Sequence, residues 1–315
     1  MMNRRHLLAA GAAWPLLPAI ARAQEATTTP AAALADAQRF TVGDVTVTAL
    51  SDGALRIGPE ALQGIDAEGY ATLMRDRFRD PETFRAAVNG WLIETGDGQA
   101  TLVDAGAGAT MGDSLGRLMR NLRAAGTEPA QVTRLLATHL HPDHVGGALA
   151  DGAAAFPDAE LVVTEAERAY WSDDANVTEG TRSFFETARA VLDAYGDRLR
   201  PVTGEAEVGA SVTAVPLPGH TPGHTGYRID SGGESLLLWA DIVHVAPVQF
   251  ARPEVTIGFD VNPDEAAETR ARILDRVAAD RTMIAGSHID FPGLGHVARD
   301  GEGYRLVDAP YPYPD

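Results

Sequence analysis

Three histidines and an aspartate fall within six residues in the segment His139-Leu140-His141-Pro142-Asp143-His144. The segment follows directly on the apolar residues 135–138, which have the composition of a buried strand. Because side chains alternate along an extended chain, His139 and His141 project from the same face and can bind one ion. The turn that follows places Asp143 and His144 on a different side from His139 and His141. Adjacent imidazoles that bound nothing would leave ring nitrogens without partners, so the segment predicts a metal site at a strand end.

The composition limits which metal chemistry is available. The chain has no cysteine, which excludes disulfides, thiol nucleophiles and thiolate metal ligands. Every basic residue is arginine, which excludes Schiff-base and lysine general-base mechanisms. Histidine and carboxylate ligands without sulfur permit zinc, manganese, cobalt or iron. With a net charge of −18 and no local basic patch, the chain is not expected to bind nucleic acid.

Residues 1–23 have the features of an export signal. Arg4 and Arg5 precede a weakly apolar run that reaches Ile20, and Ala21-Arg22-Ala23 is a small-x-small cleavage pattern. We therefore predict a twin-arginine signal peptide at 1–23 and a periplasmic or secreted protein. The apolar run is too short, and too broken by proline, to cross about 30 Å of hydrocarbon as a helix. An uncleaved anchor stays open as the alternative, and no stable membrane insertion is expected after processing.

The rest of the chain has the pattern of one α/β domain. After a polar linker at 24–38, strand and helix patterns alternate through 39–315 without an internal repeat. Residues 54–88 carry polar and aromatic residues without a clear period, which indicates a long functional loop or excursion. The predicted strands are 45–50, 91–95, 100–103, 135–138, 161–163, 212–215, 227–230, 235–239 and 283–285. The predicted helices are 115–126, 184–195 and 263–279.

Further ligand-type residues stand at other strand ends. His220, Asp241 and His288 each come directly after an apolar strand pattern. A single one of them would more often be a core histidine or a helix-capping aspartate. Together they indicate that the strands deliver ligands to one edge of a sheet, as open α/β sheets do.

These motifs resemble a known family. The segment 139–144, Gly219-His220-Thr221-Pro222-Gly223-His224, Ala240-Asp241 and Gly286-Ser287-His288 resemble, in order and spacing, the metallo-β-lactamase fold hydrolases that hold two metal ions. Asp104, in Val103-Asp104-Ala105-Gly106, looks like that family's Asp-x-Gly strand end, whose aspartate usually supports a ligand histidine from behind. The resemblance implies an α/β fold in the form of an αββα sandwich, with the ions in a cleft at one edge of the two sheets.

Within that family, the export signal, the chain length and residues 291–297 resemble the methyl parathion hydrolase branch. Carried over, the resemblance implies two zinc ions per chain, with manganese, cobalt or iron as substitutes. One zinc would be held by His139, His141 and His220, and the second by Asp143, His144 and His288. Asp241 would bridge the ions, and Asp143 and Asp241 are the expected catalytic carboxylates. A hydroxide shared by the ions would then be the nucleophile.

The expected function is hydrolysis of ester bonds in a neutral small molecule: an organophosphate triester, an aryl ester or a lactone. The alternatives are a lactonase acting on acyl-homoserine lactones, and an iron oxygenase or a non-hydrolytic metal-binding protein of the same fold. No sequence feature names the substrate, and a homodimer is left open as the assembly.

Some aromatic residues and histidines lack a clear assignment. Trp171, Phe184 and Phe185 are predicted to line an apolar substrate pocket, with ordinary core packing as the alternative. The roles of His224, His244 and His296 stay open between orienting a ligand and satisfying the core, and none of them is predicted as a ligand.

Overall fold

The computed structural model describes residues 36–96 and 98–310. The predicted signal peptide at 1–23 lies outside the described residues, as does most of the predicted linker at 24–38. The strand β1 begins at Ala37, inside the predicted linker. The described residues belong to one compact unit.

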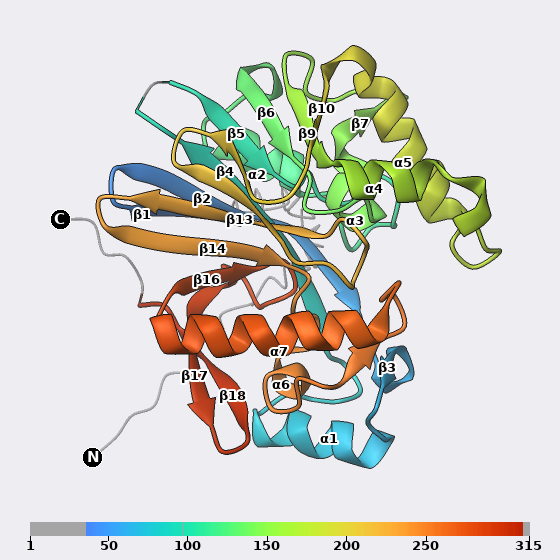
Figure 1. Cartoon of the computed structure of the whole chain (residues 1–315), viewed down its shortest axis with the longest axis vertical. Coiled ribbons are helices and arrows are strands. Elements are labelled where there is room, and N and C mark those ends of the chain that lie inside the picture. The colour runs from blue at the N-terminus through green and yellow to red at the C-terminus, as the bar shows by residue number, and fades with distance from the viewer. Residues whose placement is uncertain (1–35, 97, 311–315) are drawn as a thin grey trace, which may run out of the picture. The chain divides into compact units, whose positions relative to one another are not determined.

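Two mixed sheets carry the fold (Figure 1). The first sheet has the strand order β1-β2-β4-β5-β6-β9-β10, and the second has the order β11-β12-β13-β14-β16-β17-β18. The first sheet contains β1 (Ala37–Val42), β2 (Val45–Arg56), β4 (Arg85–Glu94), β5 (Ala100–Val103), β6 (Val132–Leu136), β9 (Glu160–Thr164) and β10 (Leu199–Val202). The second sheet contains β11 (Ala206–Gly209), β12 (Val212–Pro216), β13 (Thr225–Ser231), β14 (Glu234–Ala240), β16 (Met283–Gly286), β17 (Leu294–Asp300) and β18 (Gly303–Asp308).

Helices and short pairings complete the chain. The α-helices are α1 (Ala67–Asp76), α2 (Leu118–Ala124), α3 (Pro142–Val145), α4 (Glu165–Ser172), α5 (Arg182–Tyr195), α6 (Ala246–Gln249) and α7 (Pro263–Asp280). Short 3-10 turns lie at Pro59–Ala61, Pro129–Gln131, Gly146–Ala148, Asp174–Asn176 and Gly196–Arg198. Two small ribbons pair β3 (Leu62–Gln63) with β15 (Thr256–Ile257), and β7 (Leu149–Ala150) with β8 (Ala153–Ala154).

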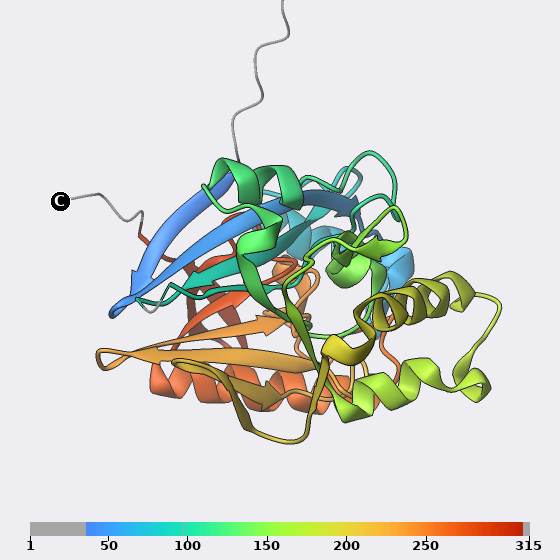
Figure 2. The same ribbon diagram turned by 90° about the horizontal axis from the view of Figure 1, so that it is seen from above.

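The alternation of side chains along the central strands produces the layers. In β6, Leu135 packs with α2 and α5, whereas Leu136 packs between the two sheets. In β14, Leu238 lies between the sheets, whereas Trp239 packs with α7 on the outer face of the second sheet. Each apolar strand is therefore buried on both faces, which is why its sequence is a continuous apolar run. Figure 2 shows α2 and α7 on opposite outer faces of the sheets, so the predicted αββα sandwich is confirmed.

The excursion at 54–88 has more regular structure than its sequence suggests. It holds the end of β2, the ribbon strand β3, the helix α1 and the start of β4. Tyr70 and Met74 of α1 are buried in a cluster that also contains Val245 and Val248. Because α1 places few apolar residues against the domain, its period is weak in the sequence.

Parallel pairing brings the ligand-bearing strand ends together. β5, β6 and β9 run parallel in the first sheet, and β14 and β16 run parallel in the second. Their carboxyl ends therefore meet at one edge of the sandwich, which is where open sheets place their sites.

No helix within the described residues combines the length and apolar character that a membrane crossing needs.

A buried carboxylate fixes the loop that leads from β5 to α2. Asp52 lies at an irregularity of β2 and is fully buried. Its Oδ2 accepts hydrogen bonds of 2.9 Å from the amides of Ala107 and Gly116, and its Oδ1 accepts one of 2.9 Å from the amide of Leu118. The loop therefore folds around one side chain.

We predict that Asp52→Asn lowers the free energy of unfolding by about 2–3 kcal/mol, because the amide NH₂ faces a buried N–H where an oxygen accepted before. Urea denaturation measures this change. The exposed Asp44 offers a matched control, and Asp44→Asn should change stability by less than about 0.5 kcal/mol. Equal effects of the two variants would contradict this account of the loop.

Candidate metal centre

The seven side chains predicted as metal ligands lie together at the shared edge of the two sheets. Each is mostly or fully buried, and each follows a strand or opens the turn after one. They are His139, His141, Asp143, His144, His220, Asp241 and His288. Among the described residues, their ligand atoms form overlapping groups in which all atoms lie within 4.8 Å of one another.

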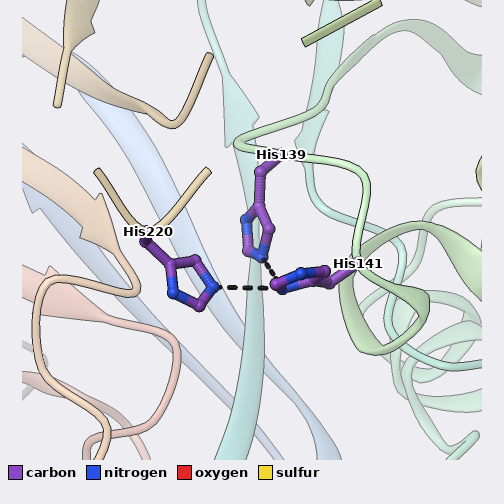
Figure 3. Close-up of side chains that lie close together, drawn as sticks. All are labelled: His139, His141 and His220. Carbon is purple, nitrogen blue, oxygen red and sulfur yellow. Dashed lines mark hydrogen bonds between the residues drawn. The ribbon is translucent and has the colours of Figure 1, made fainter. Parts of the chain in front are cut away.

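The first group is His139, His141 and His220 (Figure 3). His141 Nδ1 lies 2.9 Å from His139 Nε2 and 3.0 Å from His220 Nε2. The strand end after β6 and the loop after β12 thus present their ring nitrogens to one point. A cation at that point could be bound by three imidazoles.

The second group is Asp143, His144 and His288. Asp143 Oδ2 lies 3.5 Å from His144 Nε2 and 3.7 Å from His288 Nε2. Asp143 and His144 lie on the short helix α3, where Pro142 occupies the first turn and directs the chain away from the extended His139–His141 stretch. The predicted change of direction after His141 is therefore present.

Asp241 contacts both groups. Its Oδ2 lies 3.4 Å from His220 Nε2 and 3.0 Å from His288 Nε2, and its Oδ1 lies 3.3 Å from His144 Nε2. Such a position suits a carboxylate shared by two cations.

Hydrogen bonds behind the centre aim the ring nitrogens inward. His144 Nδ1 lies 2.8 Å from Asp104, His220 Nδ1 lies 2.8 Å from Asp260, and His288 Nδ1 lies 2.8 Å from the carbonyl of Ala87. When each Nδ1 donates its proton to that oxygen, the lone pair of Nε2 points to the centre. Asp104 is placed as the resemblance implied. Asp260 was missed, because no spacing in the sequence links it to His220.

A second missed residue, Glu167 of α4, is fully buried and joins two ligand loops. Its Oε1 accepts a hydrogen bond of 2.9 Å from the amide of Leu140, which lies between His139 and His141. Its Oε2 accepts hydrogen bonds from Thr221 Oγ1 at 2.7 Å and from the amide of Gly223 at 3.0 Å. The loop after β6 and the loop after β12 are thus held at a fixed separation.

The electrostatics of the centre favour a bound cation. Burial lowers the pKa of His139 and of His141 well below the ordinary value. For His144, burial lowers the pKa, but the carboxylates of Asp241, Asp143 and Asp104 outweigh it and raise the pKa well above the ordinary value. Without another cation, protonated histidine is what compensates the buried carboxylates.

Unsatisfied atoms test whether a metal fits. Within the described part of the chain, His144 Nε2 and Asp241 Oδ1 are buried without a hydrogen-bond partner, although they lie 3.3 Å apart. Buried polar atoms are normally paired, so orphaned ligand atoms in one place indicate a missing partner. Imidazole and carboxylate are ligands that zinc accepts, and the residues present therefore fit metal ions.

The three unassigned histidines have different positions. His224 Nδ1 bonds the carbonyl of Leu217 at 2.8 Å, and its Nε2 accepts a hydrogen bond of 3.2 Å from the amide of Asp241, so it supports the backbone of that residue. His244 belongs to the centre, because its Nε2 lies 3.1 Å from Asp241 Oδ2 and its ring stacks on His288. His296 lies on β17, where it pairs with Met283 of β16.

An apolar cleft of about 160 Å³ opens onto the centre. The side chains that line it beside the ligands include Leu55, Ile57, Met111, Phe184 and Phe259. Except for Phe184, the sequence did not single these residues out, since the other four come from three separate segments.

The prediction that Trp171 and Phe185 line this pocket needs correction. Both side chains are only 1% exposed and pack against each other in the core, with ring centroids 4.5 Å apart. On α5, Phe185 shares a face with Ala188 and Leu192, whereas the adjacent Phe184 turns toward the cleft. Trp171 donates a hydrogen bond of 2.6 Å to Glu167 and touches the centre through the edge of His141.

Comparisons with known proteins agree with this geometry. Residues 84–288 match the Metallo-beta-lactamase superfamily. A probable metallo-hydrolase of Mycobacterium tuberculosis (strain ATCC 25618 / H37Rv) is 30% identical over 180 residues, which is 48% of this chain and 54% of that protein. An N-acyl homoserine lactonase from Bacillus sp. is 23% identical over 178 residues, 55% of this chain and 62% of that protein. The chain thus spans just over half the length of the curated relatives it matches.

Solved structures are similar over more of the chain. The hydrolase AbOPH of the beta lactamase superfamily is 31% identical with a TM-score of 0.83, and the match covers 89% of this chain and 100% of that one. The dizinc quorum-quenching lactonase AidC, in complex with the product N-hexnoyl-L-homoserine, has a TM-score of 0.84 at 24% identity, over 89% and 99% of the two chains. At 24% identity, the similarity to AidC shows a shared fold only. Because the matched residues 84–288 cover most of the chain and contain every predicted ligand, the protein belongs to the metallo-β-lactamase superfamily.

Proposed function

We propose that the protein is a binuclear zinc hydrolase that acts on neutral ester-type substrates: an organophosphate triester, an aryl ester or a lactone. The observation that carries the proposal is the position of Asp241, whose carboxylate lies within 3.4 Å of histidines from both ligand groups. A structural metal site would be closed by its own ligands, whereas here an apolar cleft reaches the ligand atoms.

The ligands divide between two ions. His139, His141 and His220 would hold one, Asp143, His144 and His288 would hold the other, and Asp241 would contact both. When bound, such ions supply Lewis acidity for a carbonyl or phosphoryl oxygen and lower the pKa of water to near 7.

The protein's own groups orient the ligands and exclude water. Asp104, Asp260 and the carbonyl of Ala87 each hold one Nδ1–H, so those rings cannot rotate away from the centre. Asp143 and Asp241 both line the cleft and place carboxylate oxygens where an ester group would enter. The apolar wall keeps bulk water from the reacting bond, which strengthens the interactions there.

The cleft supports a neutral, apolar substrate. Its lining beside the histidines and aspartates is aliphatic and aromatic except for Arg56, which forms an ion pair with Glu60. An apolar group gains about 25 cal/mol for each Å² removed from water. A chain with a net charge of −18 repels anions at long range. Phosphate monoesters and nucleotides are therefore disfavoured.

A lactonase acting on acyl-homoserine lactones is the second candidate. The likeness to an N-acyl homoserine lactonase supports it, and the apolar cleft could take an acyl chain. Both of these candidates are hydrolases. Hydrolytic turnover therefore distinguishes them from an iron oxygenase and from a non-catalytic metal-binding protein.

We also propose export through the twin-arginine route, to the periplasm or beyond. The motif at Arg4 and Arg5 and the cleavage pattern at residues 21–23 support it.

The first prediction concerns metal content and reaction. Elemental analysis of freshly purified protein should find close to two transition-metal ions per chain, mainly zinc. A chelator should abolish turnover of triesters, aryl esters or lactones and lower the melting temperature, because ligand binding stabilises the folded state. His296→Ala is a matched control that should keep both ions. Active protein without transition metal would overturn the proposal, and bound iron with oxygen consumption but no hydrolysis would favour the oxygenase.

The second prediction concerns the shared carboxylate. Asp241→Ala removes a ligand of both groups, so it should lower metal occupancy and reduce kcat by more than about 100-fold. His224→Ala removes only a support of the Asp241 backbone, and supports of this kind are worth about 10–100-fold. Elemental analysis measures the metal occupancy of the two variants, and parallel assays measure kcat for each. Equal and mild losses in the two variants would mean that Asp241 does not bridge.

The third prediction uses the neighbouring phenylalanines of α5. Phe184→Ala should raise KM for aryl or long-acyl substrates by roughly tenfold while metal content stays constant, because the ring faces the cleft. Phe185→Ala should lower the free energy of unfolding by about 3–5 kcal/mol, because that ring lies in the core. An unchanged KM in Phe184→Ala would remove Phe184 from the substrate site.

A further inference from the structure

Arg270 of α7 is 1% exposed, and no other arginine within residues 36–96 and 98–310 is buried to this degree. A guanidinium keeps its charge, and a buried charge is costly unless hydrogen bonds and an opposite charge compensate it. Arg270 lines neither the apolar cleft nor a ligand group. Its role therefore has to be found in the contacts that it makes.

The guanidinium donates hydrogen bonds to three backbone carbonyls of one loop. Its Nε bonds the carbonyl of Ile242 at 2.7 Å, and its Nη1 bonds the carbonyls of Pro253 and Val255 at 2.8 Å each. Ile242 directly follows Asp241, the carboxylate that contacts both ligand groups. Because the planar fork of arginine reaches several acceptors at once, one side chain ties the two ends of this loop together.

The loop leads directly to the carboxylate behind His220. Val255 is followed by the short strand β15, and the amide of Ile257 in that strand donates a hydrogen bond of 3.1 Å to Asp260 Oδ2. Asp260 Oδ1 lies 2.8 Å from His220 Nδ1. Arg270 Nη2 itself lies 3.9 Å from Asp260 Oδ2, and both side chains are buried. A chain of contacts therefore runs from α7 through Asp260 to a ligand of the first group.

Backbone hydrogen bonds join the segment after Asp260 to the loop after β12. The amide of Val261 bonds the carbonyl of His220 at 2.9 Å, and the amide of Asn262 bonds the carbonyl of Gly219 at 2.9 Å. A shift of that segment would therefore move the backbone and the ring of His220 together.

We propose that Arg270 is a positioning residue of the metal centre: its hydrogen bonds to the loop hold Asp260 against His220 and thereby set how tightly the first ligand group binds its ion. The inference rests on the proposed binuclear site and adds to it a residue that contacts neither ion.

The charge of Arg270 by itself acts against a cation at the centre. Like charges repel, and Arg270 lines the same small space as His220 and Asp241. Removing the charge alone would therefore tighten metal binding, whereas removing a support of the ligands would weaken it. Because the two effects have opposite signs, the direction of the change in zinc affinity distinguishes them.

Competition between the zinc-loaded protein and a chelator of known affinity tests the proposal, because it measures zinc dissociation constants without any substrate. Arg270→Met keeps the apolar stem and removes the hydrogen bonds. It should raise the dissociation constant of one zinc ion by about tenfold or more, since supports behind a ligand are worth about 10–100-fold. Arg270→Lys keeps the charge but lacks the planar fork, so it should lose affinity as well. The lysine variant also decides the matter if Arg270→Met does not fold.

Arg198→Met is the matched control. Arg198 likewise donates to three backbone carbonyls, those of Phe156, Pro157 and Ala159, and none of these residues belongs to a ligand loop. With both zinc sites saturated, Arg198→Met and Arg270→Met should each lower the melting temperature, because each leaves carbonyls without their donors. Only Arg270→Met should change a zinc dissociation constant.

Hydrogen exchange at the histidine rings gives a second measurement. In the zinc-loaded protein, nitrogen-15 NMR can follow the Nδ1–H of His220, which Asp260 holds. Arg270→Met should speed its exchange with solvent by about tenfold or more. The Nδ1–H of His288, which the carbonyl of Ala87 holds, should exchange as in the wild type.

Zinc binding that is unchanged or tighter in both Arg270→Met and Arg270→Lys overturns the proposal and leaves the proposed function intact. An equal loss of affinity in Arg198→Met also overturns it, because lower stability alone would then account for the change. A wild type that binds fewer than two zinc ions contradicts the proposed function, and the inference about Arg270 fails with it.

Discussion

The rest of the structure depends on one constraint: imidazole and carboxylate groups are buried close together in a space from which water is excluded. Asp241 lies within 3.7 Å of ring nitrogens of His139, His144, His220 and His288, all of them buried. Neutral imidazoles cannot all donate to one another, and a buried carboxylate needs a compensating positive charge. The fold therefore holds an arrangement that is unfavourable by itself and becomes favourable when cations occupy it. Metal binding and folding stability are coupled for this reason.

Holding such groups together requires supports that do not face the metals. Glu167 is the most extensive of them, since one carboxylate bonds Leu140 in the first loop and both Thr221 and Gly223 in the second. Burial raises its pKa, and these hydrogen bonds act in the opposite direction. A fully connected buried network of this kind fixes geometry more firmly than separate pairs would. Because α4 packs against the sheet, Glu167 holds the two ligand loops at a constant distance from each other.

Parts of this arrangement could be predicted from the sequence and parts could not. The period of two in residues 139–141 and the apolar strands before the isolated ligands were sufficient to collect the ligands, because strand ends are local features. Asp260 and Glu167 act across long sequence separations, and no local pattern marks them. The wrong inclusion of Phe185 among the pocket residues could have been avoided, because Phe185, Ala188 and Leu192 follow the helical period of a buried face. The helix α1 was missed because only Tyr70 and Met74 of it are buried, so its helical period is weak in the sequence.

The chain separates its chemistry from its selectivity. Ligands stand on strand ends, where a shift of even one residue would turn the side chain to the other face. The apolar wall of the cleft comes instead from the end of β2, the loop holding Met111, the first turn of α5 and the loop holding Phe259. Loops and element ends tolerate substitution and insertion far better than paired strands do. The superfamily's metal centre can therefore stay constant while the substrate changes. Membership in the superfamily consequently identifies the type of centre, and the substrate has to be found from those four wall segments.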